Sequence, residues 1–183
     1  MGGGAGRPAA LAMSALDQRS LLTELESEYP EPEAHEDLEW LVADWAREAD
    51  HTPNPAAVLR FQREDLEART AGRDGAARLE ALRAHVVARR VDHLGARTFA
   101  LGKAILAGDV ADGDARARGE ALREEADALA DELRELPETP DLAPVRRALG
   151  DAVMEALFAI ERKAMSPRLA RESGDQAGPP QVR

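Results

Sequence analysis

Apolar residues recur every three or four positions along most of this chain, between short segments rich in proline and glycine. Residues 33–50 show the pattern clearly, because Leu38, Leu41 and Trp45 fall on one face of a helix whose other faces are largely acidic. Such spacing is typical of an amphipathic helix, whereas a half-buried strand would alternate apolar and polar residues. No segment shows that alternation. The pattern predicts six helices, at about residues 15–28, 33–50, 55–71, 76–107, 114–136 and 142–165.

Helix-terminating residues support this division of the chain. Pro30 and Pro32 follow the first predicted helix, and Asn54 is a good N-cap before Pro55, a favoured first helical residue. Alanine, the best helix former, occupies 37 positions, while aromatic residues make up only 3%. The expected fold is therefore all-α: a helical bundle of five or six helices.

The predicted helix 76–107 is apolar around much of its circumference. One stripe of mostly large apolar residues runs along it, namely Leu79, Leu82, Val86, Val87, Val91, Leu94, Thr98, Leu101 and Ile105. A second, offset seam consists of small residues at every seventh position, namely Ala81, Ala88, Gly95 and Gly102. Each glycine costs a helix about 1 kcal/mol relative to alanine, a cost that close packing against another backbone would offset. We expect this helix to be central, with a kink near Gly95 as the alternative. Ala88, Gly95 and Gly102 are also candidates for self-association.

The bundle is expected to form one domain over residues 14–166. Residues 1–13 are interpreted as a disordered N-terminal extension, with Met13 as an alternative start to Met1. Residues 167–183 are polar and are interpreted as a disordered C-terminal tail.

The net charge of −11 is unevenly distributed. Residues 17–50 contain 12 acids and 2 bases, whereas residues 51–107 contain 10 bases and 6 acids. Two interpretations stay open: the two regions pair with each other, or the acidic segment meets a basic partner protein. Nucleic acid is not an expected partner, because no run of Lys and Arg is free of neighbouring carboxylates.

Composition narrows the classes of protein to which the chain can belong. The chain has no cysteine, which excludes disulfides, thiol catalysis and Cys-ligated metal centres. No apolar run reaches the roughly 20 residues of a membrane span, so no membrane partner and a cytoplasmic location are expected. The excess of arginine over lysine, together with the alanine content, suggests a GC-rich bacterial genome.

Histidines offer the main candidates for a metal site, beside a magnesium site at Glu36, Asp37 and Glu39 whose spacing does not match that of all-α nucleotide hydrolases. His85 and Asp92 lie seven residues apart and share a helix face, and His93 lies one residue further round. A mononuclear site would use these residues with a carboxylate from another helix. The alternative is that the histidines are ordinary surface or boundary residues. No cofactor is predicted.

Trp40 is the remaining candidate for an interaction site. It lies off the apolar stripe of segment 33–50, so it either anchors a partner or covers an adjoining helix.

Signatures of catalysis are otherwise absent. The serines lie in caps and termini, and no glycine-rich phosphate loop follows a strand. The sequence therefore favours a non-enzymatic protein that acts through protein–protein interaction or self-association, in a regulatory or adaptor role. The alternative is a bundle that binds a small apolar ligand or a metal ion between its helices.

Overall fold

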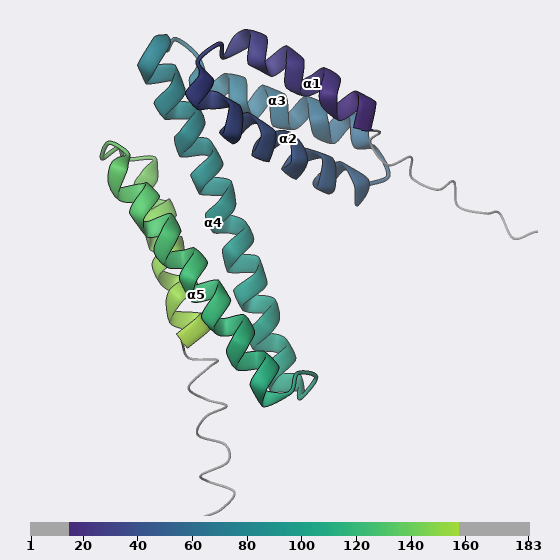
Figure 1. Cartoon of the computed structure of the whole chain (residues 1–183), viewed down its shortest axis with the longest axis vertical. Coiled ribbons are helices and arrows are strands. Elements are labelled where there is room, and N and C mark those ends of the chain that lie inside the picture. The colour runs from purple at the N-terminus through teal and green to yellow at the C-terminus, as the bar shows by residue number, and fades with distance from the viewer. Residues whose placement is uncertain (1–14, 158–183) are drawn as a thin grey trace, which may run out of the picture. The chain divides into compact units, whose positions relative to one another are not determined.

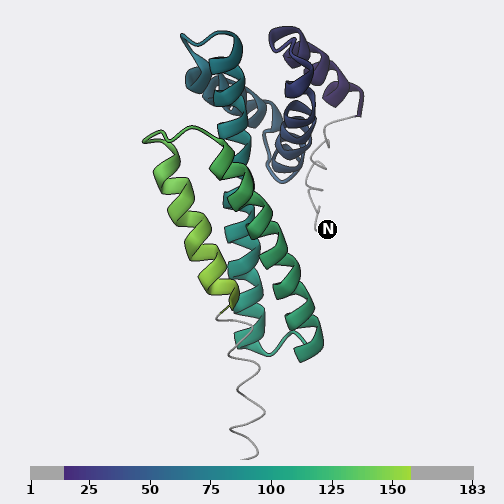
Figure 2. The same ribbon diagram turned by 60° about the vertical axis from the view of Figure 1, so that its left-hand side comes forward.

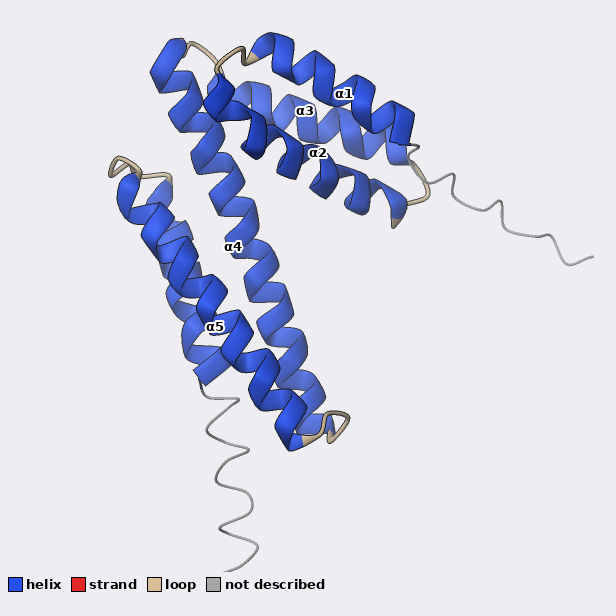
Figure 3. Cartoon of the chain, viewed as in Figure 1, coloured by secondary structure: helices blue, strands red, loops and turns tan. Residues whose placement is uncertain are grey.

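The computed structural model describes residues 15–157, and every regular element in that range is a helix (Figure 3). The helices, labelled in Figure 1, are α1 (Ala15–Glu28), the 3₁₀ turn η1 (Pro32–Ala34), α2 (His35–Asp50), α3 (Pro55–Thr70), α4 (Gly75–Ala107), α5 (Asp112–Glu135) and a last helix over residues 142–157. The predicted all-α bundle is confirmed. The predicted tails, 1–13 and 167–183, lie outside the described residues, as does the predicted end of the last helix.

The chain divides into two compact units, and the boundary falls inside α4, between Val86 and Val87. We refer to residues 15–86 as the first unit and to residues 87–157 as the second unit. The single domain expected over residues 14–166 stays a prediction. Across residues 15–157, no helix combines the length and the apolar character that a membrane crossing requires.

The first unit is built around α2, which contacts both α1 and α3. Trp45 is fully buried, as its place on the apolar stripe predicted. Its neighbours in the core come from all four helices of the unit, among them Leu25, Leu38, Leu66 and Leu82. Burial of large apolar side chains is the main stabilising contribution to such a core.

Charged side chains join the acidic and the basic segments of the first unit. The Arg63 guanidinium on α3 lies 2.8 Å from Glu24 Oε2 and 2.5 Å from Glu28 Oε1 on α1. The hydrogen bond to Glu24, followed by a further hydrogen bond to Glu67 and the nearby carboxylate charges, raises the pKa of Arg63 despite its partial burial. Arg78 at the start of α4 also donates to the Glu28 carbonyl, at 3.0 Å. The interpretation in which the two charged regions pair with each other therefore holds for these contacts.

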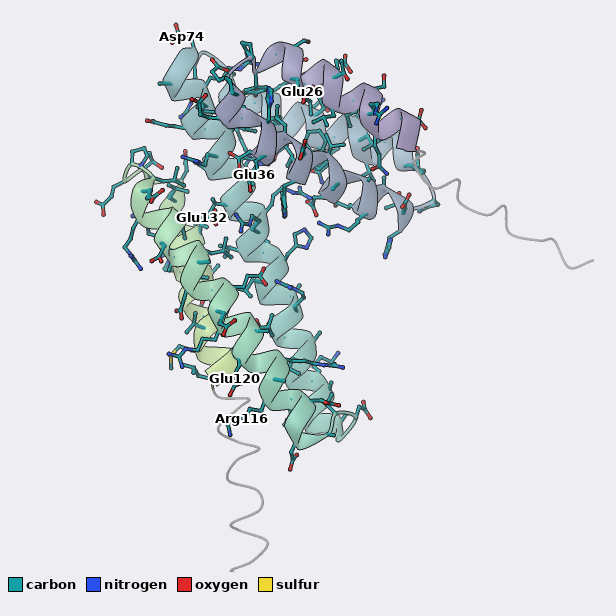
Figure 4. All side chains as sticks on the ribbon, in the orientation of Figure 1. Glu26, Glu36, Asp74, Arg116, Glu120 and Glu132 are labelled. Atoms are coloured by element: carbon teal, nitrogen blue, oxygen red, sulfur yellow. The ribbon has the colours of Figure 1, made fainter. Side chains whose placement is uncertain are left out.

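The second unit consists of the rest of α4, α5 and the helix 142–157, which run beside one another in both views (Figures 1 and 2). Its buried residues include Val91 and Leu94 of α4, Leu122 and Leu129 of α5, and Leu149 of the last helix. Ion pairs between described residues link α4 to α5. Arg90 Nη1 donates to Glu132 Oε2 at 2.6 Å, on the α5 position labelled in Figure 4, and Arg97 pairs with Glu125.

Local chemistry explains where the helices begin and end. The side chain of Asn54 caps α3 by accepting a hydrogen bond from the Ala57 amide at 3.3 Å, as expected. Helix α4 ends at Ala107 and is followed by Gly108, whose φ of +78° is in the left-handed region that favours glycine. The Asp109 amide donates to the Ala104 carbonyl and the Gly108 amide to the Ile105 carbonyl. These two bonds form a Schellman motif.

Candidate interaction surface

Helix α4 buries the apolar stripe that its sequence predicted. In the second unit, Val91, Leu94, Thr98, Leu101 and Ile105 are all at most 7% exposed. These positions follow the spacing of three and four residues that defines one helix face. Thr98 satisfies its hydroxyl group within the helix by donating to the Leu94 carbonyl at 2.8 Å. This stripe forms the core side of α4 in the second unit.

A different face of α4 exposes large apolar side chains. Phe99 is 60% exposed and Leu106 is 69% exposed. They alternate along the helix with half-buried Gly95 and Gly102. Steps of four and three residues extend the same face back to half-buried Ala88. We call this surface the open face of α4, formed by Ala88, Asp92, Gly95, Phe99, Gly102 and Leu106.

The glycines of the open face are not covered by another part of the described chain. A Cβ atom added at Gly95 or at Gly102 would meet no atom within 4 Å. The close approach of a second helix of the same bundle, which the seam predicted, is therefore not found there. The reason is that α4 presents its larger apolar stripe, not its glycines, to its neighbours in the second unit. Ala81, in the first unit, is the only member of the seam that is buried, at 8% exposure.

The open face carries one acid and has one base beside it. Asp92 is exposed near its N-terminal end, and Lys103 is exposed near its C-terminal end. Neither forms an ion pair with any residue in the described part of the chain. The Lys103 ammonium lies 5.7 Å from the centroid of the Phe99 ring, within the range of a cation–π contact. The face thus has an apolar centre and a balanced pair of charges.

A groove runs between α4 and α5 on another side of the second unit, with a volume of about 430 Å³. Leu101 and Leu122 supply buried apolar side chains to its lining, and Arg97 and Glu125 pair across it. The rest of the lining consists of Ala100, Ala104, Arg118 and Ala121. The small alanine side chains leave the space that makes the groove.

Trp40 is half-buried and packs against the apolar core of the first unit. This contact favours the interpretation in which Trp40 covers adjoining residues of its own chain. Its role as a partner anchor stays a prediction.

The predicted metal residues do not form a ligand set. His85 is 4% exposed in the first unit, and its Nδ1 lies 3.8 Å from Asp65 Oδ2. Asp92 and His93 are exposed in the second unit. Within residues 15–157, no group of three or more His, Cys, Asp or Glu side chains is placed to hold a metal ion. A site at His85, Asp92 and His93 has no support from the geometry and stays a prediction.

The spacing of small residues in the sequence predicted Ala88, Gly95 and Gly102 of the open face but not Phe99 and Leu106. The signal was present, because residues 95, 99, 102 and 106 follow one helix face with alternating small and large side chains. The groove had no sequence signal, because it depends on how α4 and α5 pack.

Comparison with known proteins does not assign the chain to a family. No family model, no curated protein and no solved structure matches it. Its function is therefore inferred from its own surfaces.

Proposed function

We propose that this protein is a non-enzymatic helical module that binds a protein partner through the open face of α4, in a regulatory or adaptor role. The observation that carries the proposal is the exposure of Phe99 and Leu106 beside two glycines with open space above them. Exposed aromatic and aliphatic side chains on one helix face are the usual anchors of helix-mediated recognition. The glycines add room for a partner's side chains or backbone.

The surroundings of this face support a protein partner. The chain's negative net charge opposes direct contact with nucleic acid. A cytoplasmic setting is part of the proposal, and it rests on the sequence alone.

The experiment compares the natural chain with a variant in which Phe99→Glu and Leu106→Glu place charges on the face. A matched control is Phe61→Glu, because Phe61 is 65% exposed in the first unit and lies outside the open face. Sedimentation velocity of each purified chain reports self-association, and affinity capture from native extract reports other partners.

The proposal predicts an association that the double variant loses and the Phe61→Glu control keeps. Circular dichroism should show the same helix content for all three chains, because the three mutated side chains, Phe99, Leu106 and Phe61, are all exposed. An association that survives the double variant, or the absence of any association, would refute the proposal.

The groove between α4 and α5 favours a second candidate function, the binding of a small apolar ligand. Its volume of about 430 Å³ lies within the range of small-molecule sites. Arg118 in its lining forms no ion pair within residues 15–157, so it is available to an anionic group. A small apolar carboxylate fits this combination of an apolar lining and a cation.

Isothermal titration with decanoate tests this second candidate. Ala104→Phe should abolish the heat of binding by filling the groove, whereas Ala117→Phe, at an exposed position of α5 outside the groove lining, should leave it unchanged. Equal binding by both variants, or no binding by the natural chain, would reject the groove as a ligand site.

A further inference from the structure

We infer that the partner of the open face is the open face of a second copy of this chain, with the two α4 helices antiparallel and centred on position 97. This inference rests on the proposed function and names its partner. The order of small and large side chains along the face and the placement of its two charges support it.

When the open face is paired with a second copy running in the opposite direction, its large side chains lie opposite small ones. The pairs Ala88–Leu106 and Gly95–Phe99 have the same midpoint, position 97 of the chain. In an antiparallel pair of helices centred there, each member of a pair lies opposite the other member in the second copy. The Phe99 ring then lies over Gly95 of the second copy, and Leu106 lies over its Ala88. Every large apolar side chain of the face meets a small residue.

The space for this arrangement is present in the chain. A Cβ atom at Gly95 would meet no described atom within 4 Å beyond its own turn of helix, so no neighbouring element of the described chain occupies the position where the Phe99 ring of the second copy would begin to pack. Phe99 and Leu106 are already largely exposed, so no rearrangement of their own chain is needed before they contact a second copy. Packing of large side chains against glycine and alanine allows two helix backbones to approach closely.

Charge placement supports the same register. Asp92 and Lys103 have a midpoint within half a residue of position 97. In the antiparallel pair, each Asp92 carboxylate comes beside the Lys103 ammonium of the second copy, which gives two equivalent ion pairs. Neither group has an ion-pair partner among the described residues of its own chain. Exposed pairs of this kind fix the register and orientation of an interface more than they add affinity.

A parallel arrangement lacks this complementarity. It would place Phe99 opposite Phe99 and Gly95 opposite Gly95 at the same height along the two helices. Two rings would then compete for one space, while a void would remain between the glycines one turn away, and tightly packed interfaces tolerate neither. The sequence of the face therefore distinguishes between the two orientations.

A size-swap experiment tests the register. Gly95→Phe should clash with Phe99 of the second copy, and Phe99→Gly should leave a void against its Gly95. Each single variant should raise the dimer dissociation constant at least about tenfold in sedimentation equilibrium. The double variant Gly95→Phe with Phe99→Gly exchanges the two partners of the pair and should restore dimerisation. Circular dichroism checks that all variants remain helical, which the open space above Gly95 allows.

Engineered cysteines give an independent readout, because the chain contains no cysteine of its own. The double variant Ala88→Cys with Leu106→Cys should form intermolecular disulfides on mild oxidation. Within one helix these positions are about 27 Å apart, which is too far for an intramolecular bond. The single variant Ala88→Cys is the control, because antiparallel packing keeps its two copies equally far apart.

The outcomes separate this inference from the proposed function. A dimer that is rescued by the size swap and crosslinked only by the Ala88–Leu106 cysteine pair supports the antiparallel register. Crosslinking of Ala88→Cys alone, or failure of the swap to rescue, would overturn it. A strictly monomeric chain would also overturn it. The proposed function would survive that last result if a different protein were captured through Phe99 and Leu106, and it would fall with the inference if none were.

Discussion

Two glycines in the middle of α4 allow the effect of a single methyl group on stability to be calculated from the structure. Gly95 and Gly102 lie within a continuous helix, and neither has a φ value in the left-handed region. A Cβ atom at either position would meet no atom within 4 Å. Substitution by alanine therefore removes the conformational entropy cost of glycine without creating a clash in the isolated chain.

The expected gain is about 1 kcal/mol at each site, because glycine is less favourable than alanine by that amount in a helix interior. The two positions are about 10.5 Å apart along the helix axis, so their effects should add. The double variant Gly95→Ala with Gly102→Ala should thus raise the free energy of unfolding by about 2 kcal/mol. In a chain of this length, the melting temperature should rise by roughly 4–8 °C.

Urea unfolding followed by circular dichroism measures this gain, at protein concentrations low enough to keep the chain monomeric. Gly108→Ala is the matched control of opposite sign, because the φ of +78° at Gly108 makes alanine unfavourable by about 1 kcal/mol. At high concentration the double variant should dimerise more weakly, since methyl groups occupy the space that the second copy's side chains would fill. A loss of stability in the dilute double variant would refute the reasoning, because it would mean that another part of the chain covers this seam.

Three further predictions concern packing and charge within the two units. Leu129→Ala should reduce stability by about 2–4 kcal/mol in chemical denaturation because Leu129 is fully buried, whereas Leu106→Ala, at a side chain 69% exposed, should change it by less than about 0.5 kcal/mol. Trp40→Ala should lower the free energy of unfolding of the first unit by about 1–2 kcal/mol, because Trp40 packs partly on the core. This loss is smaller than that expected for a fully buried tryptophan. An unchanged melting temperature would favour the interpretation of Trp40 as a partner anchor. Arg63→Gln should cost about 1–2 kcal/mol at low salt because it leaves several carboxylates of α1 and α3 without their shared cation, and a cost that persists undiminished in high salt would contradict an electrostatic origin.

The helices themselves could be read from the sequence with small errors. Predicted and observed ends within the described residues agree to within two positions, because apolar periodicity, the Asn54 cap and the terminal glycines and prolines are local signals. The buried face of α4 was predicted for the same reason: a stripe such as Val91, Leu94 and Leu101 can be buried only on one side of a helix.

The tertiary structure decided which helix faces are buried against neighbouring helices and which stay exposed. The sequence placed Ala88, Gly95 and Gly102 in one seam, but whether a neighbouring helix of the same chain covers that seam depends on how the helices pack. Packing in the second unit uses the larger apolar stripe and leaves the glycines open beside Phe99. The predicted metal residues illustrate the same limit of sequence-based prediction. Spacing within one helix can place His85 and Asp92 on a shared face, but it does not show whether another helix supplies a further ligand.

Local sequence therefore determined which segments are helical and which side of each helix is apolar, because both depend on interactions between residues three or four positions apart. The division of the chain within α4, the groove between α4 and α5 and the exposure of Phe99 and Leu106 depend on contacts between residues far apart in sequence. Those contacts are selected by the fit of whole helix surfaces to one another, and residue spacing within a single helix does not encode that fit.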